Sequence, residues 1–176
     1  MTADFQIRRG AANDLEFLVD IEIADEGVTP GYRSNDDVAR IRDLIATFID
    51  HGGAVVAVAS GTRIGAIVWR LRNIASVEPS SVFRKLDRSL FPADGSFAEI
   101  FQLWVDPQHR RRGIGTTLKR AVETEARSRG AGMIYTHTEA RHEHVIALNH
   151  KLGYREARRG PIWDAIERVS LVKMLE

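Results

Sequence analysis

Apolar and polar positions in the first half of the chain predict three strands and two helices. The strands are expected at residues 5–9, 54–59 and 63–71, and a tight Ser-Gly-Thr turn joins the last two as a hairpin. Apolar residues at helical spacing predict helices at residues 13–27 and 34–53. Gly27 is expected to end the first helix, and Ser34 or Asn35 to cap the second.

The second half of the chain adds three more strands and two more helices. The strands are predicted at residues 97–105, 133–138 and 168–175, and the helices at residues 114–129 and 142–153. Residues 72–95 contain two prolines and predict an irregular connection with a short helix around residues 81–90. This order of elements predicts an α/β (α+β) fold. We expect a single domain over residues 1–176, in which helices flank both faces of a mixed, mainly antiparallel central sheet.

The run FAEIFQLWV, residues 97–105, is the clearest strand in the sequence. Simple alternation divides its side chains between two faces, with Glu99, Phe101, Leu103 and Val105 on one and Ile100, Gln102 and Trp104 on the other. Both faces are mostly apolar, so the strand is expected to be central and covered on both sides.

The composition narrows the class of protein. The chain has 25 basic and 24 acidic residues, a formal net charge of +1, whereas a dedicated nucleic-acid-binding protein usually has a larger basic excess. It has no cysteine, which excludes thiolate nucleophiles and cysteine metal sites. There is no long apolar stretch and no apolar signal region at the start. We expect a cytoplasmic protein without a membrane or nucleic-acid partner, and a homodimer is compatible with the sequence.

The stretch HRRRGIG, residues 109–115, lies between the predicted central strand and the helix that follows. A helix N-terminus attracts anions through its free N–H groups and its dipole. Gly113 and Gly115 would let a ligand approach the backbone closely, and Arg110, Arg111 and Arg112 add positive charge. The stretch therefore predicts a pyrophosphate site. A solvated turn and a local nucleic-acid patch are the alternatives.

Two motifs at this spacing resemble the GNAT superfamily of acetyl-coenzyme A dependent N-acetyltransferases. The pyrophosphate loop of that family, Gln/Arg-x-x-Gly-x-Gly/Ala, is matched by Arg110, Gly113 and Gly115. Its later helix typically ends in Leu-Gly-Phe or Leu-Gly-Tyr, matched by the Leu-Gly-Tyr of residues 152–154. The resemblance implies direct transfer of an acetyl group from acetyl-coenzyme A to a primary amine of a small molecule or peptide, without a metal. It leaves the acceptor undefined.

The resemblance also implies which residues bind the cosubstrate. In the family the pantetheine arm pairs with the central strand, and the pyrophosphate binds the loop after it. These positions, together with one on the later helix, correspond here to Leu103, Trp104, Val105, Arg110, Arg111, Arg112, Gly113, Ile114, Gly115, Thr116 and Asn149.

Two positions bear on catalysis. Some family members place a catalytic glutamate where Glu99 stands, and burial beside phenylalanines would raise the pKa of such a base toward a useful range. The alternative is a solvated carboxylate at the start of the strand, with the proton leaving through water that Gln102 could orient.

The second position is Asn149, on the later helix. Many members have a proton-donating tyrosine where this chain has Asn149, and an amide cannot donate a proton near neutral pH. Tyr135 and Tyr154 are substitutes without positional support.

Further readings remain open at this point. His137, His142 and His144 lie close together with two glutamates, but they lack metal-site spacing and fit the rim of an acceptor pocket or plain surface better. Trp163 follows Gly-Pro in an expected exposed loop. Acidic residues of the first helix, Glu22, Asp25 and Glu26, favour a cationic acceptor. The main alternative to an enzyme is a non-catalytic coenzyme A sensor or interaction module.

Overall fold

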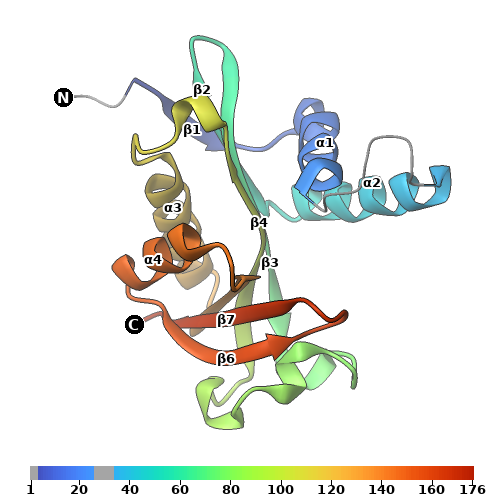
Figure 1. Ribbon diagram of the computed structural model, residues 1–176, viewed down its shortest axis with the longest axis vertical. Coiled ribbons are helices and arrows are strands. Elements are labelled where there is room, and N and C mark those ends of the chain that lie inside the picture. The colour runs from blue at the N-terminus through green and yellow to red at the C-terminus, as the bar shows by residue number, and fades with distance from the viewer. Residues whose placement is uncertain (1–3, 26–33) are drawn as a thin grey trace. The chain divides into compact units, whose positions relative to one another are not determined.

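The computed structural model describes residues 4–25 and 34–176 (Figure 1). In these two ranges the chain forms four α-helices and seven strands: β1 Gln6–Arg9, α1 Leu15–Asp25, α2 Asn35–Asp50, β2 Ala54–Ala59, β3 Thr62–Asn73, β4 Ser96–Val105, α3 Ile114–Ser128, β5 Met133–Glu139, α4 Glu143–Lys151, β6 Arg155–Pro161 and β7 Glu167–Met174. The strands are hydrogen-bonded in the order β1-β2-β3-β4-β5-β7-β6. Only the β4–β5 pair is described as parallel, so the predicted mixed, mainly antiparallel sheet is confirmed.

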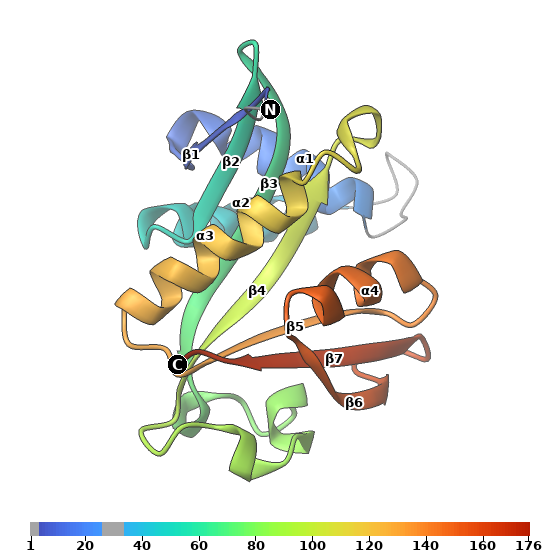
Figure 2. The same cartoon turned by 90° about the vertical axis from the view of Figure 1, so that its left-hand side faces the viewer.

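The chain divides into two compact units, and the first comprises residues 1–70 and 101–119. In it β1, β2 and β3 pair antiparallel, and α1 and α2 pack on one face of the strands around Ala66 and Val68. The first turns of α3 lie across β3 on the other face, at Gly65 (Figure 2). Helices therefore flank both faces, as predicted. The single domain over residues 1–176 stays a prediction.

The second unit comprises residues 71–100 and 120–176. The start of β4 pairs with β5, with Glu99 opposite Tyr135, and β7 lies between β5 and β6. The connection before β4 folds onto this sheet and buries apolar side chains in a core of Ile74, Val77, Val82, Phe83, Leu86, Phe91, Phe97, Met133, Tyr135 and Val172. The expected short helix in this connection is instead two 3-10 turns, capped by the side chains of Ser81 and Asp87.

Several boundaries agree closely with the sequence. Ser34 caps α2 by accepting a hydrogen bond from the Asp37 backbone N–H at 3.2 Å. Gly130 follows α3 with φ of 86°. The stop expected at Gly27 and the acidic side chains of Asp25 and Glu26 lie outside the part of the molecule that can be described. None of the helices in the described ranges combines the length and apolar character needed to cross a bilayer.

The sequence missed strand β6. Its residues, REARRGP, are mostly charged and show no apolar alternation, so the segment reads as a loop. It forms a strand because it is an outer strand of the sheet, where only one neighbour, β7, must be paired. Outer strands tolerate charge and proline because one edge of them faces no partner.

The prediction of simple alternation along β4 is wrong at Phe101 and Gln102. These neighbours in sequence both contact the layer of α1 and α2: the Phe101 ring lies 5.2 Å from that of Phe48, and the Gln102 amide donates to Glu22 at 2.6 Å. Successive side chains of a regular strand point to opposite faces, so β4 departs from regular geometry here. The Gln102 Nε2 is therefore used in a contact with α1, and the role of Gln102 in orienting a water stays a prediction.

Candidate active site

The loop between β4 and α3 is built by short-range hydrogen bonds. The Asp106 carboxylate accepts from the Gln108 backbone N–H at 2.8 Å and caps a 3-10 turn over Pro107–His109. The Arg110 Nε donates to the Val105 carbonyl at 3.2 Å, which folds that side chain back onto the end of β4. The first helical turn of α3 then begins at Ile114.

The end of this loop has a backbone conformation suited to an anion. Arg111 and Gly113 both have positive φ, 62° and 81°. A Cβ added at Gly113 would meet no atom within 4 Å, so the space in front of the glycine is open. The first intrahelical bond runs from the Thr117 N–H to the Gly113 carbonyl at 2.9 Å. The preceding N–H groups of the first turn have no acceptor within the helix, which is the arrangement that binds phosphate.

Gly65 of β3 determines how closely α3 approaches the sheet. A Cβ there would lie 2.8 Å from Cγ2 of Ile114 and 3.3 Å from the Trp104 carbonyl oxygen, closer than side chains normally pack. Ile114 is 1% exposed, so the helix is anchored by the residue between Gly113 and Gly115. Thr116 and the strand residues Leu103, Trp104 and Val105 are partly exposed. The loop residues that the sequence pointed to are thus brought together in the first unit.

In the second unit Glu99 is buried, at 8% exposed, rather than solvated. The surroundings differ from the expected apolar ones, because the Arg72 guanidinium donates to Glu99 Oε2 at 3.3 Å. The same guanidinium donates to Glu78 at 3.1 Å. Sequence reasoning missed Arg72, because it lies 27 positions before Glu99 and nothing in the residues around it indicates a contact with that glutamate.

His137 of β5 is the second candidate base, and the sequence pointed to it only as one of three clustered histidines. Its Nδ1 atom is buried and has no hydrogen-bond partner among the described residues. Burial lowers the pKa of the imidazole; the charge of Glu99 opposes this shift and the charge of Arg168 adds to it. A lowered pKa favours the neutral imidazole, which has a ring nitrogen free for a proton, and makes it a weaker base than an ordinary histidine.

The two tyrosines offered as substitutes for a proton donor are poorly suited to that role. The Tyr135 hydroxyl is hydrogen-bonded to Ser170 at 3.0 Å, and burial raises the pKa of its phenol. Burial also raises the pKa of the Tyr154 phenol, and the nearby Glu123 carboxylate raises it further. A phenol with a raised pKa is a weaker acid, so neither is prepared to protonate a thiolate.

Asn149 lies on the buried side of α4, as its spacing predicted, and is 1% exposed. Its Nδ2 donates to the Val145 carbonyl at 2.9 Å. Its Oδ1 is buried, and the residues that the structure describes offer it no hydrogen bond. Buried amide oxygens are nearly always hydrogen-bonded, so this acceptor is prepared for a donor from outside the chain.

The histidine cluster has no arrangement that would hold a metal. The rings of His142 and His144 are 6.0 Å apart, and His142 Nδ1 lies 3.4 Å from the Thr138 hydroxyl. No group of three or more histidine, aspartate or glutamate side chains in residues 4–25 and 34–176 could coordinate one ion. Metal-free chemistry stays a prediction of the resemblance.

Residues 16–154 match the family model described as "Acetyltransferase (GNAT) family". The chain therefore belongs to the GNAT acetyltransferase family. No sequence among the curated proteins matches it.

Solved structures share the fold at low sequence identity. NAA60 of Arabidopsis thaliana in complex with acetyl-CoA is 20% identical with a TM-score of 0.70, covering 97% of this chain and 98% of that one. The yncA protein of Salmonella typhimurium with its cofactor acetyl-CoA is 19% identical with a TM-score of 0.71, covering 98% and 95%. An agmatine N-acetyltransferase in its apo form is 16% identical with a TM-score of 0.71, covering 98% and 100%. At these identities the likeness concerns the fold.

Proposed function

We propose that the protein transfers an acetyl group from acetyl-coenzyme A to the nitrogen of a primary amine. The observation that carries the proposal is the loop before α3, where an open glycine with positive φ precedes a helix N-terminus rich in arginine. The family membership over residues 16–154 supports the cosubstrate, and neighbours of known structure include an agmatine N-acetyltransferase.

The fit to acetyl-coenzyme A rests on two features of the chain. The backbone N–H groups at Gly113–Thr116 and the exposed side chains of Arg111 and Arg112 would hold the pyrophosphate. The buried Oδ1 of Asn149 would accept a hydrogen bond from the pantetheine arm or the thiol. When bound, the cosubstrate supplies an activated acetyl thioester.

The chain's own part in the reaction is to prepare the amine. An amine attacks only when neutral, so a base must accept its proton, and Glu99 and His137 are the candidates. Arg72 holds the Glu99 carboxylate in place, and the neutral imidazole of His137 can accept a proton at a ring nitrogen. The Asn149 Oδ1 is an acceptor and would bind an N–H of the pantetheine arm, not the departing thiolate. As the thioester C–S bond breaks, the thiolate would take its proton from water, and the proton lost by the amine would stay on the base.

Thiol release distinguishes this function from a non-catalytic coenzyme A-binding module. We expect acetyl-coenzyme A to release free thiol faster when mixtures of primary amines are added, with the acetylated amine detected by mass spectrometry. A module that only binds coenzyme A would show calorimetric binding and no amine-dependent release. Absence of binding would contradict both readings.

The phosphate site gives a prediction with a matched control. Gly113→Ala should weaken coenzyme A binding by about 10- to 100-fold, because a methyl group would occupy the approach to the backbone N–H groups and remove one or two charge-assisted hydrogen bonds. Gly61 has nearly the same conformation, φ 79° against 81°, and equally open space. Gly61→Ala should therefore cost similar folding stability and leave calorimetric affinity unchanged. Equal affinities for the two variants would remove the phosphate site.

Asn149 gives a prediction on binding. Asn149→Ala should raise KM for acetyl-coenzyme A or lower kcat, in either case by about 5- to 100-fold, because it removes one buried hydrogen-bonding partner. The alkaline limb of the pH profile should persist, since the amide donates no proton. Affinity for desulfo-coenzyme A and turnover with acetyl-coenzyme A measure the two effects separately. If both stay at the parent's values, Asn149 serves only to bond Val145 within the helix.

A further inference from the structure

The turn between β6 and β7 presents apolar side chains to solvent. The exposed large apolar residues of the described ranges are Ile7, Leu71, Trp163, Ile166 and Met174. Two of them, Trp163 and Ile166, lie in this one turn, and Trp163 has the largest exposed fraction, 64%. Tryptophan is enriched at interfaces, so an exposed tryptophan that the fold holds in place is a candidate contact for a ligand.

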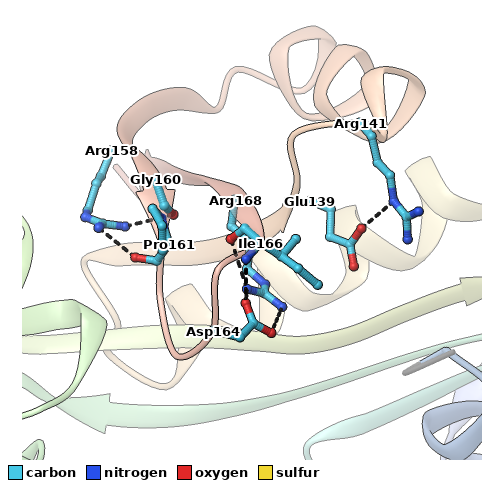
Figure 3. A network of polar contacts seen from close by, with 8 residues as sticks. All are labelled: Glu139, Arg141, Arg158, Gly160, Pro161, Asp164, Ile166 and Arg168. Carbon is cyan, nitrogen blue, oxygen red and sulfur yellow. Dashed lines mark hydrogen bonds and ion pairs between the residues drawn. The ribbon is translucent and has the colours of Figure 1, made fainter. Parts of the chain in front are cut away.

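A buried arginine fixes the Trp163 ring. The Arg168 guanidinium lies 4.2 Å from the ring centroid, and Arg168 is only 6% exposed. Both of its terminal nitrogens donate to the Asp164 carboxylate, one of them at 3.0 Å, and one also donates to the Ile166 carbonyl at 3.2 Å (Figure 3). Arg168 thus contacts the Trp163 ring, the Asp164 carboxylate and the Ile166 carbonyl, and these contacts within one turn hold the indole in position without a ligand.

The Trp163 ring also contacts the candidate base. The centroid of the His137 imidazole lies 5.2 Å from that of the Trp163 ring, and the two ring planes meet at 78° in a T-shaped contact. A group stacked on Trp163 would therefore lie next to His137, within the second unit. An acceptor whose amine is at His137 would place the atoms beside that amine on the indole.

The charge around the ring selects the kind of group that can stack. The negative π cloud of Trp163 already interacts with the Arg168 guanidinium, so a second cation stacked on the exposed part of the ring gains less from the same π cloud. An uncharged aromatic ring has no such penalty and gains from offset stacking. This argument opposes the cationic acceptor that the acidic residues of α1 favoured.

We propose that Trp163 determines acceptor specificity by stacking on an uncharged aromatic group next to the reactive amine. The proposal rests on the proposed acetyltransferase function and names its substrate class: arylalkylamines, or peptides whose first side chain is aromatic. Asp164 and Arg168 act as positioning residues because they hold the indole.

The test compares phenylethylamine, butylamine and diaminobutane as acceptors with saturating acetyl-coenzyme A. The parent should have its highest kcat/KM for phenylethylamine and its lowest for diaminobutane. Trp163→Ala should lower the ratio of phenylethylamine to butylamine by about 10-fold, mainly through KM for phenylethylamine, whereas Trp163→Phe should keep most of it. Ile166→Ala removes another exposed apolar side chain of the same turn, and it should leave the ratio unchanged.

A second readout separates this inference from the function. The Trp163 indole N–H resonance, assigned by its loss in Trp163→Phe, should shift when phenylethylamine is added to the coenzyme A complex and stay unchanged with diaminobutane. A shift without acetylation of any amine would refute the function and retain the stacking site. Three outcomes would overturn the role of Trp163 and leave the acetyltransferase function standing. In each of them an amine is acetylated, but the indole resonance does not shift, the ratio is unchanged in Trp163→Ala, or the parent prefers diaminobutane.

Discussion

Glu99→Gln is expected to lower kcat/KM for an amine acceptor by about 10- to 1,000-fold near pH 7, because it removes a base while keeping the size of the side chain. The Glu99 carboxylate is buried and accepts a hydrogen bond from Arg72. The substitution replaces one carboxylate oxygen by an NH2 group and removes the negative charge. The deficit should shrink as the pH approaches about 10, the ordinary pKa of an alkyl ammonium, where the acceptor is neutral without help. Steady-state rates across this pH range measure it.

Glu78 supplies the matched control. It contacts the same Arg72 guanidinium, but its side chain is 71% exposed. Glu78→Gln should leave the rate near the parent's, since an exposed ion pair is screened by water. A Glu99→Gln variant with the parent's rate and pH profile would transfer the role of base to His137, and His137→Gln would then show the large loss.

The largest effect on stability is expected at Asp14. Its carboxylate is fully buried and accepts hydrogen bonds from Arg8 at 2.7 and 2.9 Å, from Arg63 at 2.6 Å and from the Ala11 N–H at 2.8 Å. Asp14→Asn leaves two guanidinium groups without their shared anion, and should lower the free energy of unfolding by about 3 kcal/mol. Urea denaturation of the two proteins at pH 7 measures the difference.

The pH dependence of this difference follows from the direction of the shift. The hydrogen bond from Arg8, with that from Arg63, holds the pKa of Asp14 below its ordinary value. The stabilisation is therefore complete above the unfolded pKa of about 3.9 and is lost as the pH falls below it. Glu16→Gln breaks an exposed pair with Arg42 and should change stability little. A constant difference between the parent and Asp14→Asn down to pH 2 would contradict this account.

The position of the loop between β4 and α3 could be predicted because all of its information is local; its binding of pyrophosphate stays a prediction. Arg110, Gly113 and Gly115 lie within six positions, between a strand and a helix that their own patterns define. Asn149 could be placed on a buried face for the same reason, because helical spacing alone decides it. These inferences need no knowledge of distant contacts.

What could not be predicted depends on pairing between segments far apart in the sequence. The partner of Glu99 comes from the end of β3, and Arg168 reaches Trp163 only because β6 and β7 form a hairpin that the polar residues of β6 concealed. At the irregularity Phe101 packs against Phe48 of α2, a long-range contact that a repeat of two residues does not predict. His137 has no sequence feature that separates it from its neighbouring histidines.

The two outer strands of the sheet have a property that affects self-association. β1 and β6 each carry adjacent arginines, Arg8–Arg9 and Arg158–Arg159, and β6 ends in Pro161, which has no N–H to offer. Pairing two copies edge to edge would bring like charges together along the new ladder. We therefore expect these outer strands to disfavour open-ended sheet growth at high concentration.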